Sequence, residues 1–353
     1  MSRFFNEKYS SLEAYTPGEQ PRDMKYIKLN TNESPYPPSK GVIAAIDRAC
    51  VENLRLYPDP EAKELKEAIA ALYGVGRENV FLSNGSDDIL NFTFMSFFDK
   101  HGVIFPDISY GFYKVYAELY GLDYKAIPLC DDFTIAVDDY IGTGRNIVIA
   151  NPNAPTGIAL SLSEIERIVS SNRERVVLVD EAYVDFGAES AVSLTKKYDN
   201  LIVCATYSKS RSLAGARLGF AIADAGLIGD LEKIKFSTNP YNINRMTMAA
   251  GIAAIADNDY YMENCKKIAE TRAYVTDELR ALDFEVLPST ANFIFARSEK
   301  IGGEELYLAL KSMGILVRHF TSERIKDFNR ITIGTRDDMS ALVDAVKKIL
   351  ERK

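Results

Sequence analysis

The chain has 353 residues, of which 47% are hydrophobic and 26% charged, a composition typical of a folded globular protein. Its net charge of −8 argues against a general attraction to nucleic acid or to an anionic membrane surface. The four cysteines have no paired spacing, the two histidines form no metal motif, and no stretch has the pattern of a signal peptide or a membrane span. We therefore expect a cytoplasmic protein without a metal site.

Residues 1–40 are rich in proline, asparagine and polar residues, which predicts an extended arm. After residue 40, segments with helical spacing alternate with short apolar segments. We expect helices over 41–53 and 60–73, from 86, after 110 and over 163–171, and strands over 79–82, 102–105, 146–150, 176–179 and 201–205. Ser163 and Glu166 have the spacing of a capping box at the start of the fifth helix. The last three strands are apolar throughout, as in a mostly parallel sheet with helices on both faces.

The last third of the chain has a different pattern. A long helix-rich stretch after residue 244 precedes four short apolar segments and a final helix. We expect these strands over 284–286, 292–296, 315–318 and 330–333, and the helix over 337–351. The sequence thus predicts an arm at 1–40, a large α/β domain at 41–244 and a small α+β domain at 245–353 that packs with part of the arm.

Three polar side chains follow the central apolar strands. They are Asn151, Asp180 and Lys209, and each is 29 residues from the next. Because ligands bind beyond the carboxyl ends of strands in open α/β sheets, we expect an amide, a carboxylate and an amine to meet at one edge. Thr206 and Ser208 precede the lysine there. Each residue alone is most simply a cap or a surface group, so the prediction depends on their joint position.

A phosphate site is indicated by the segment after the first strand. Gly85, Ser86 and Asp87 form a glycine turn at the expected start of a helix, where backbone N–H groups and the helix dipole favour an anion. The glycine patterns of dinucleotide-binding and P-loop proteins are not found. A lysine amine, an acidic group and a phosphate site together match the needs of pyridoxal 5′-phosphate (PLP).

Further motifs extend this pattern along the chain. They are Tyr15-Thr-Pro-Gly18, Leu29-Asn-Thr-Asn-Glu33-Ser-Pro35, Tyr57-Pro58-Asp59, Asn84-Gly-Ser-Asp87, Pro106 to Tyr110, Asn151 to Gly157, Asp180-Glu-Ala-Tyr183, Leu213-Ala-Gly-Ala-Arg217-Leu-Gly219 and Arg330-Ile-Thr-Ile-Gly-Thr-Arg336. In order, and over nearly the whole chain, they resemble the histidinol-phosphate aminotransferase family among the fold-type I PLP-dependent transferases. Asn-Pro-Asn-Ala-Pro-Thr-Gly alone is shared by many aminotransferases, whereas the arm motifs with Arg318 and Arg330 point to this branch.

The resemblance implies a role for each matching residue. Lys209 would carry PLP as a Schiff base and transfer the substrate proton, with Asp180 on the pyridine nitrogen. Asn151 and Tyr183 would bond to the phenolic oxygen, and Tyr110 would stack on the ring. The phosphate ligands would be Gly85, Ser86, Asp87, Thr206, Ser208 and Arg217, with Tyr57 from the second subunit of a homodimer. Arg330 would bind the substrate α-carboxylate and Arg318 a second anion, beside Tyr15 and Asn32.

The resemblance implies transamination between histidinol phosphate and 2-oxoglutarate, as in histidine biosynthesis. Two other PLP reactions stay open, those of an aromatic or broad-range aminotransferase and of a threonine-phosphate decarboxylase. A PLP-sensing transcriptional regulator is disfavoured, because an arm of forty residues is too short for a winged-helix domain. Arg211 departs from the small or apolar residues usual after the lysine, and we expect its charge near the cofactor rim.

Overall fold

The computed structural model describes residues 4–352, apart from the side chain of Ala49. Residues 1–3 of the expected arm and residue 353 lie outside that range. A seven-stranded sheet forms the centre of the larger unit, in the order β2-β8-β7-β6-β5-β3-β4. Its strands are β2 (Val80–Ser83), β3 (Val103–Pro106), β4 (Tyr124–Ile127), β5 (Asn146–Ala150), β6 (Val177–Asp180), β7 (Leu201–Thr206) and β8 (Gly219–Ala223).

The central sheet is mostly parallel, as predicted. Strands β4, β3, β5, β6 and β7 run parallel, and only β8 is antiparallel to its two neighbours. The expected strands over 79–82, 102–105, 146–150, 176–179 and 201–205 each match an observed strand to within one residue at either end. Two strands, β4 and β8, were not predicted. The parallel order brings the ends of β5, β6 and β7 to one edge.

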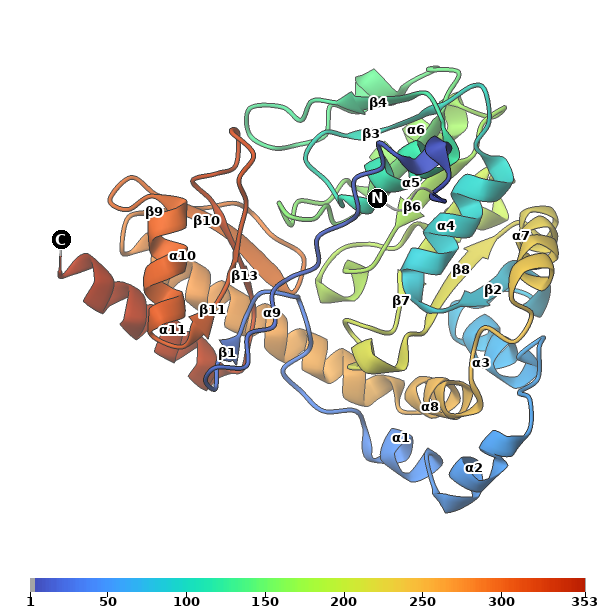
Figure 1. The fold of residues 1–353 in the computed structure, drawn as a ribbon, viewed down its shortest axis with the longest axis horizontal. Helices are drawn as coiled ribbons and strands as arrows, with labels where there is room; N and C mark the ends of the chain where they lie inside the picture. Colours follow the sequence, from blue (N-terminus) through green and yellow to red (C-terminus); the bar gives the residue numbers. More distant parts are fainter. Residues whose placement is uncertain (1–3, 353) are drawn as a thin grey trace.

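Helices cover both faces of this sheet (Figure 1). One apolar core contains side chains of α1 (Lys40–Ala45), α3 (Lys63–Tyr73), α6 (Leu162–Ser171) and α8 (Arg245–Ala256). On the other face, α4 (Gly85–Phe97), α5 (Phe112–Tyr120) and α7 (Ala225–Thr238) form a second core. The short helix α2 (Arg48–Glu52) follows α1. Burial of the strands from both sides explains why their sequences are apolar without alternation.

The smaller unit is built on a four-stranded antiparallel sheet in the order β12-β13-β10-β9. These strands are β9 (Phe284–Val286), β10 (Phe293–Ser298), β12 (Arg318–His319) and β13 (Asn329–Thr332). Side chains of α9 (Asn258–Arg280), α10 (Gly303–Ser312) and α11 (Arg336–Leu350) complete its core. In Figure 1 the long helix α9 runs from α8 to this unit. The domain boundary at residue 244 stays a prediction, since α8 itself packs with α1 and α3.

The N-terminal arm joins the two units. It carries one short strand, β1 (Ile27–Lys28), which pairs in parallel with β11 (Ile315–Leu316) of the smaller unit. Figure 1 shows the arm, in dark blue, passing from the side of α4 and α5 to the smaller unit before the chain enters α1. The arm thus has one short pairing with the smaller unit, and its bounds of 1–40 stay a prediction.

Two expectations from the sequence concern membrane spans and metal sites. Within residues 4–352, no helix combines the length and apolarity that a membrane span requires. The same residues contain no cluster of histidine, cysteine or acidic side chains suited to a metal ion. All four cysteines are free thiols.

Candidate active site

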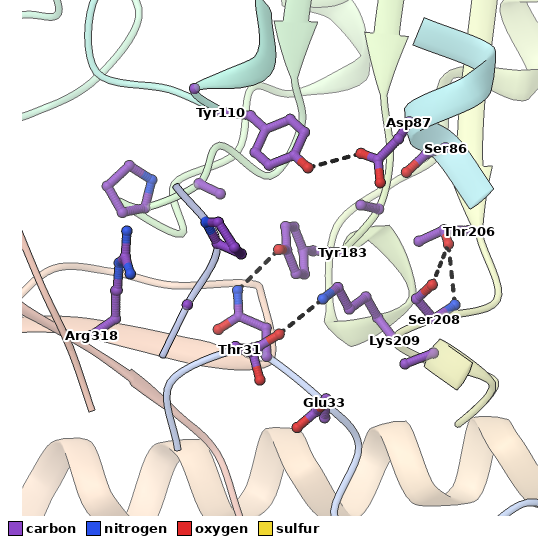
Figure 2. A pocket seen from close by; sticks show the side chains of 18 of the residues that line it. Thr31, Glu33, Ser86, Asp87, Tyr110, Tyr183, Thr206, Ser208, Lys209 and Arg318 are labelled. Carbon is purple, nitrogen blue, oxygen red and sulfur yellow. Dashed lines mark hydrogen bonds between the residues drawn. The ribbon is translucent and has the colours of Figure 1, made fainter. Parts of the chain in front are cut away.

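A cavity of about 680 Å³ lies where the sheet edge, the smaller unit and the arm meet. Thirteen of the predicted site residues line it: Tyr15, Asn32, Ser86, Asp87, Tyr110, Asp180, Tyr183, Thr206, Ser208, Lys209, Arg217, Arg318 and Arg330. Figure 2 shows Arg318 at one end, Ser86, Thr206 and Ser208 at the other, and Lys209 and Tyr183 between them. The fold thus gathers residues that are up to 315 positions apart, from Tyr15 to Arg330.

The amine of Lys209 lies in the middle of this cavity. Its Nζ donates a 3.0 Å hydrogen bond to the backbone carbonyl of Thr31 in the arm (Figure 2). Burial, with a further contribution from the positive charge of Arg330, lowers the pKa of Lys209 from 10.5 to about 8. The lowered pKa enlarges the uncharged, nucleophilic fraction of the amine to about a tenth at pH 7.

The carboxylate of Asp180 lies at the end of β6 and is 5% exposed. Burial raises its pKa to about 6, although hydrogen bonds from the Tyr113 hydroxyl and the Ala182 backbone N–H favour the ionised form. The bond from Tyr113, on α5, is 3.0 Å long. This buried carboxylate can pair with a cationic nitrogen, whose positive charge would lower the pKa of Asp180.

Hydroxyl and amide groups form an anion site at the start of α4. Asn84 is the N-cap residue of α4, but its side chain accepts no hydrogen bond from the helix. The backbone N–H groups of the first turn are therefore not capped by Asn84. The hydroxyls of Ser86, Thr206 and Ser208 lie at the same end of the cavity. Oγ1 of Thr206 donates a 3.0 Å hydrogen bond to Oγ of Ser208. Backbone approach is close here, since a Cβ on Gly219 would lie 2.4 Å from the carbonyl carbon of Gly85.

Arg217 supplies the positive charge of this anion site. Its guanidinium is 3.0 Å from the carboxylate of Asp87, which also accepts a 2.8 Å hydrogen bond from the Tyr110 hydroxyl. Gly85 does not line the cavity itself, but a Cβ there would come within 2.8 Å of the Arg217 guanidinium, and its φ of +77° favours glycine. The turn predicted from Gly85, Ser86 and Asp87 is thus present, and Asp87 connects Tyr110 with Arg217.

Two arginines from the smaller unit face the opposite end. Arg318 on β12 and Arg330 on β13 are direct partners across the antiparallel pair. Arg330 donates a 2.9 Å hydrogen bond to the carbonyl of Asn30, while its Nε is buried without a partner among the described residues. Neither guanidinium forms an ion pair with an acidic side chain of residues 4–352. Like charges directly opposite each other destabilise a strand pair, so this arrangement indicates a site for anionic groups.

Two predicted residues lie elsewhere. Both polar atoms of the Asn151 side chain bond to the backbone of Leu160. Its Oδ1 accepts from the N–H at 2.7 Å, and its Nδ2 donates to the carbonyl at 3.2 Å. Asn151 does not line the cavity, although Ala150 and Ala154 do. One hydrogen of its Nδ2 has no partner among the described residues, and a bond from it to the phenolic oxygen stays a prediction. Tyr57 is 77% exposed and stacks on Tyr241 at 4.5 Å, away from the cavity of its own chain.

The expectation for Arg211 is wrong. Its side chain is 5% exposed and does not line the cavity. Its Nη1 donates a 2.7 Å hydrogen bond to Asn258 at the start of α9. The guanidinium also lies 5.7 Å from the ring centre of Tyr261. Asn258 and the ring of Tyr261, both on α9, therefore hold this charge inside the protein and outside the cavity lining.

Other site residues were not predicted. Tyr113 has no motif around it and is found only because α5 places its hydroxyl on Asp180. Phe320 lines the cavity, and its ring centre lies 5.7 Å from the guanidinium of Arg318. Glu33 also lines it, with its carboxylate paired to Lys28 at 2.7 Å. The sequence signal for Glu33 was its place beside Asn32 in the arm motif.

These groups fit PLP, the cofactor expected from the sequence. Lys209 offers an amine of lowered pKa, Asp180 a buried carboxylate, and the start of α4 with Arg217 an anion site. The close approach of Gly219 to Gly85 leaves backbone N–H groups at that site uncovered by side chains. The donor set thus matches the aldehyde, pyridine nitrogen and phosphate of the cofactor.

Comparisons with known proteins agree with this geometry. Residues 24–346 match the family described as aminotransferase class I and II. The chain is 51% identical over 353 residues to the histidinol-phosphate aminotransferase of Brachyspira hyodysenteriae, covering 99% of this chain and 100% of that protein.

Solved structures show the same fold. The histidinol-phosphate aminotransferase of Clostridium acetobutylicum superposes with a TM-score of 0.85 at 25% identity, over 92% of this chain and 99% of that one. The Sinorhizobium meliloti enzyme of the same name, in complex with pyridoxal-5′-phosphate, gives 0.82 at 23% identity, over 93% and 92% of the two chains.

Proposed function

Because this chain belongs to the aminotransferase class I and II family, we propose that it is a PLP-dependent enzyme that transfers the amino group between histidinol phosphate and 2-oxoglutarate. Its curated relatives at 46–51% identity over the whole chain carry the name histidinol-phosphate aminotransferase. In this reaction a small amino donor and a 2-oxo acid would bind in turn in the same cavity. Its cytoplasmic location stays a prediction from the sequence.

The observation that carries this proposal is the pairing of Arg318 with Arg330 across β12 and β13. Histidinol phosphate has a phosphate at one end, and 2-oxoglutarate has a carboxylate at each end. Two guanidinium groups at the end of the cavity opposite the phosphate site suit both molecules, because a phosphate and a carboxylate can each take a bidentate pair of hydrogen bonds from arginine. We assign Arg330 to the α-carboxylate of 2-oxoglutarate. We assign Arg318 to the second carboxylate of 2-oxoglutarate or to the phosphate of histidinol phosphate.

Bound PLP supplies an electron sink that stabilises negative charge on the substrate α-carbon. Lys209 would hold the cofactor, and its Nζ would accept and return the proton of the substrate α-carbon. Asp180 would hold a proton on the pyridine nitrogen, and the hydrogen bond from Tyr113 favours the ionised carboxylate that this role needs. The N–H groups of α4, with Ser86, Ser208 and Arg217, fix the phosphate. The ring of Tyr110 limits where the cofactor ring can lie.

We also propose a homodimer in which Tyr57 acts on the phosphate site of the second copy. Tyr57 lies outside its own cavity, and 77% of its surface is exposed. Leu54 and Leu56 beside it are also about half exposed, at 49% and 46%. Three exposed side chains with apolar surface this close in the sequence favour a protein contact. Sedimentation at micromolar concentration should give twice the chain mass.

A half-reaction assay tests the function. The protein loaded with PLP is mixed with histidinol phosphate, histidinol, glutamate or an aromatic amino acid, and the absorbance of the bound cofactor is followed. We expect rapid conversion with histidinol phosphate and glutamate, and slow conversion with histidinol, which lacks the phosphate.

The other PLP reactions give different outcomes in the same assay. Faster conversion with aromatic amino acids than with histidinol phosphate would indicate an aromatic or broad-range aminotransferase. Release of carbon dioxide from phosphothreonine, without formation of glutamate from 2-oxoglutarate, would indicate a decarboxylase. Borohydride reduction followed by peptide mass analysis should place the cofactor on Lys209, and attachment to another lysine would refute the site.

A further inference from the structure

Asn32 connects the arm, the smaller unit and the larger unit at the wall of the cavity. It lies in the arm between β1 and α1, is 1% exposed, and has a left-handed backbone conformation with φ of 56°. Its carbonyl accepts a 3.0 Å hydrogen bond from Asn292. Such a conformation costs energy for a residue other than glycine, so the surrounding bonds must hold it in place.

The side-chain amide of Asn32 has two defined partners. Its Oδ1 accepts a 3.0 Å hydrogen bond from the hydroxyl of Thr332 on β13, and its backbone N–H donates to that same hydroxyl at 3.0 Å. Its Nδ2 donates a 2.9 Å hydrogen bond to the hydroxyl of Tyr183. Thr332, which accepts from the backbone and donates to Oδ1, thereby determines which end of the amide faces Tyr183.

This orientation decides the direction of the Tyr183 proton. An amide nitrogen is only a donor, so the phenol oxygen must accept from it and its own hydrogen must point elsewhere. Tyr183 lines the cavity, and its ring centre is 5.8 Å from Nζ of Lys209. The hydrogen is therefore free to be donated to a group in the cavity.

We propose that Asn32 is a positioning residue that makes Tyr183 a hydrogen-bond donor to an anionic oxygen of the ligand beside Lys209. Through Thr332, the smaller unit sets this orientation, so placement of β13 and donation by Tyr183 are coupled. The inference rests on the proposed function only in taking PLP, with its phenolic oxygen, as the ligand. Direct contact of Asn32 with the substrate, which the sequence predicted, stays a prediction.

Three variants separate orientation from shape. Asn32→Asp keeps the size of the side chain but replaces the donor with an acceptor that captures the Tyr183 proton. Asn32→Ala removes the partner and leaves the hydroxyl free to rotate. Thr332→Val keeps Asn32 and removes the hydroxyl that orients it. Tyr183→Phe defines the effect of losing the donor altogether.

The readouts are the pH midpoint of the bound-cofactor absorbance and the dissociation constant of PLP, which need no substrate. Loss of a donor disfavours the more negative form of the ligand, so Tyr183→Phe should raise the midpoint by about one pH unit and weaken binding about tenfold. Asn32→Asp should match it, and Asn32→Ala and Thr332→Val should fall between it and the unaltered protein. Thermal unfolding of the cofactor-free variants identifies any that do not fold.

A double substitution provides the decisive control. In the Tyr183→Phe background, Asn32→Ala should shift neither the midpoint nor the dissociation constant, because the proton it orients is gone. Equal shifts in both backgrounds would overturn the proposal, as would an unchanged midpoint in Asn32→Ala and Thr332→Val. Since neither readout involves an amino donor, a failure of the assigned substrate leaves this test unaffected.

Discussion

The hydroxyl of Tyr113 donates a 3.0 Å hydrogen bond to the carboxylate of Asp180. The bond links α5, on one face of the sheet, to the end of β6. Both residues are buried, at 0% and 5% exposure, so water cannot replace the hydroxyl. Because the hydroxyl stabilises the carboxylate and not the acid, it counteracts part of the rise in the pKa of Asp180 that burial causes.

Replacing Tyr113 with phenylalanine should therefore weaken PLP binding. The pKa of Asp180 would rise above about 6, and more of the carboxyl group would be protonated at neutral pH. A hydrogen bond to a charged group contributes about 1.5 kcal/mol, or roughly a tenfold change in the dissociation constant. Titration of the cofactor-free protein with PLP measures this dissociation constant.

The pH dependence of that effect distinguishes its cause. Asp180 ionises as the pH rises past its pKa, so the deficit of Tyr113→Phe should shrink between about pH 7 and pH 9. Tyr140→Phe is the matched control, since Tyr140 is 1% exposed and its hydroxyl has no partner among the described residues. An equal loss of affinity in both variants would show that Tyr113 acts only through packing.

A second prediction concerns the pH at which PLP attaches to Lys209. The neutral amine reacts, and its pKa is lowered from 10.5 to about 8, chiefly by burial and further by Arg330. The attachment rate should thus rise with pH and level off above about pH 8. Stopped-flow absorbance after mixing cofactor-free protein with PLP measures this profile.

Removal of the positive charge at Arg330 should move the profile to higher pH. Arg330→Gln takes away a repulsion that favours the neutral amine, so the pKa of Lys209 would rise toward 10.5. Arg297→Gln serves as the control, because Arg297 pairs with Glu285 on the exposed side of the smaller unit. A half-maximal rate near pH 10 in the unaltered protein, or a downward shift in Arg330→Gln, would contradict the assignment.

Much of the fold could be predicted because burial leaves a direct trace in the sequence. Runs such as 146–150 and 201–205 have no polar side of their own, and they became β5 and β7. Strand β4 has exposed residues and β8 follows an irregular turn, so neither pattern stood out. The helix predicted over 163–171 begins at Leu162, because Ser161 and Glu164 form the capping box in place of Ser163 and Glu166.

The candidate site shows a sharper limit. Strand ends placed Asp180 and Lys209 in the cavity, since parallel order fixes where strands end. Sequence does not show which partner a polar side chain takes, and Asn151 instead satisfies the backbone of Leu160. Arg211 likewise turns to Asn258, which is 47 positions away. Such tertiary contacts leave no local pattern in the sequence.

The paired arginines lead to a prediction about stability. Arg318 and Arg330 face each other across β12 and β13 with no acidic partner among residues 4–352. Removing one of two opposed like charges should stabilise the ligand-free protein by about 0.5 kcal/mol, while substrate binding suffers. We expect Arg318→Gln to raise the thermal unfolding midpoint slightly and to raise KM for histidinol phosphate at least tenfold.

Comparison of the thermal unfolding midpoint with KM for histidinol phosphate tests this prediction. Arg297→Gln should lower the midpoint or leave it unchanged, because it removes an exposed ion pair instead of a repulsion. If Arg318→Gln lowered the midpoint and left KM for histidinol phosphate unaltered, Arg318 would have a structural role and no part in anion binding.

The last prediction concerns the arm that carries Tyr15 and Gly18 over the cavity. The Glu19 carboxylate accepts hydrogen bonds from Tyr307 and Lys311 on α10, and its backbone carbonyl accepts one from Asn30 at 2.9 Å. Tyr15 is stacked on Phe112 of the large unit at 4.2 Å. Glu19 thus anchors the arm to the smaller unit while Tyr15 contacts the larger one.

Glu19→Ala should loosen the arm without altering the groups that perform the chemistry. The carboxylate is partly exposed, so its contribution is about 1 kcal/mol, and KM for the amino donor should rise about fivefold at unchanged maximal rate. Limited proteolysis should cleave the arm faster. Glu13→Ala, an exposed carboxylate on the same arm, should change neither quantity. Lys311→Ala should reproduce the effect, and the double variant should be no worse than Glu19→Ala, whereas additive losses would show that the two residues act separately.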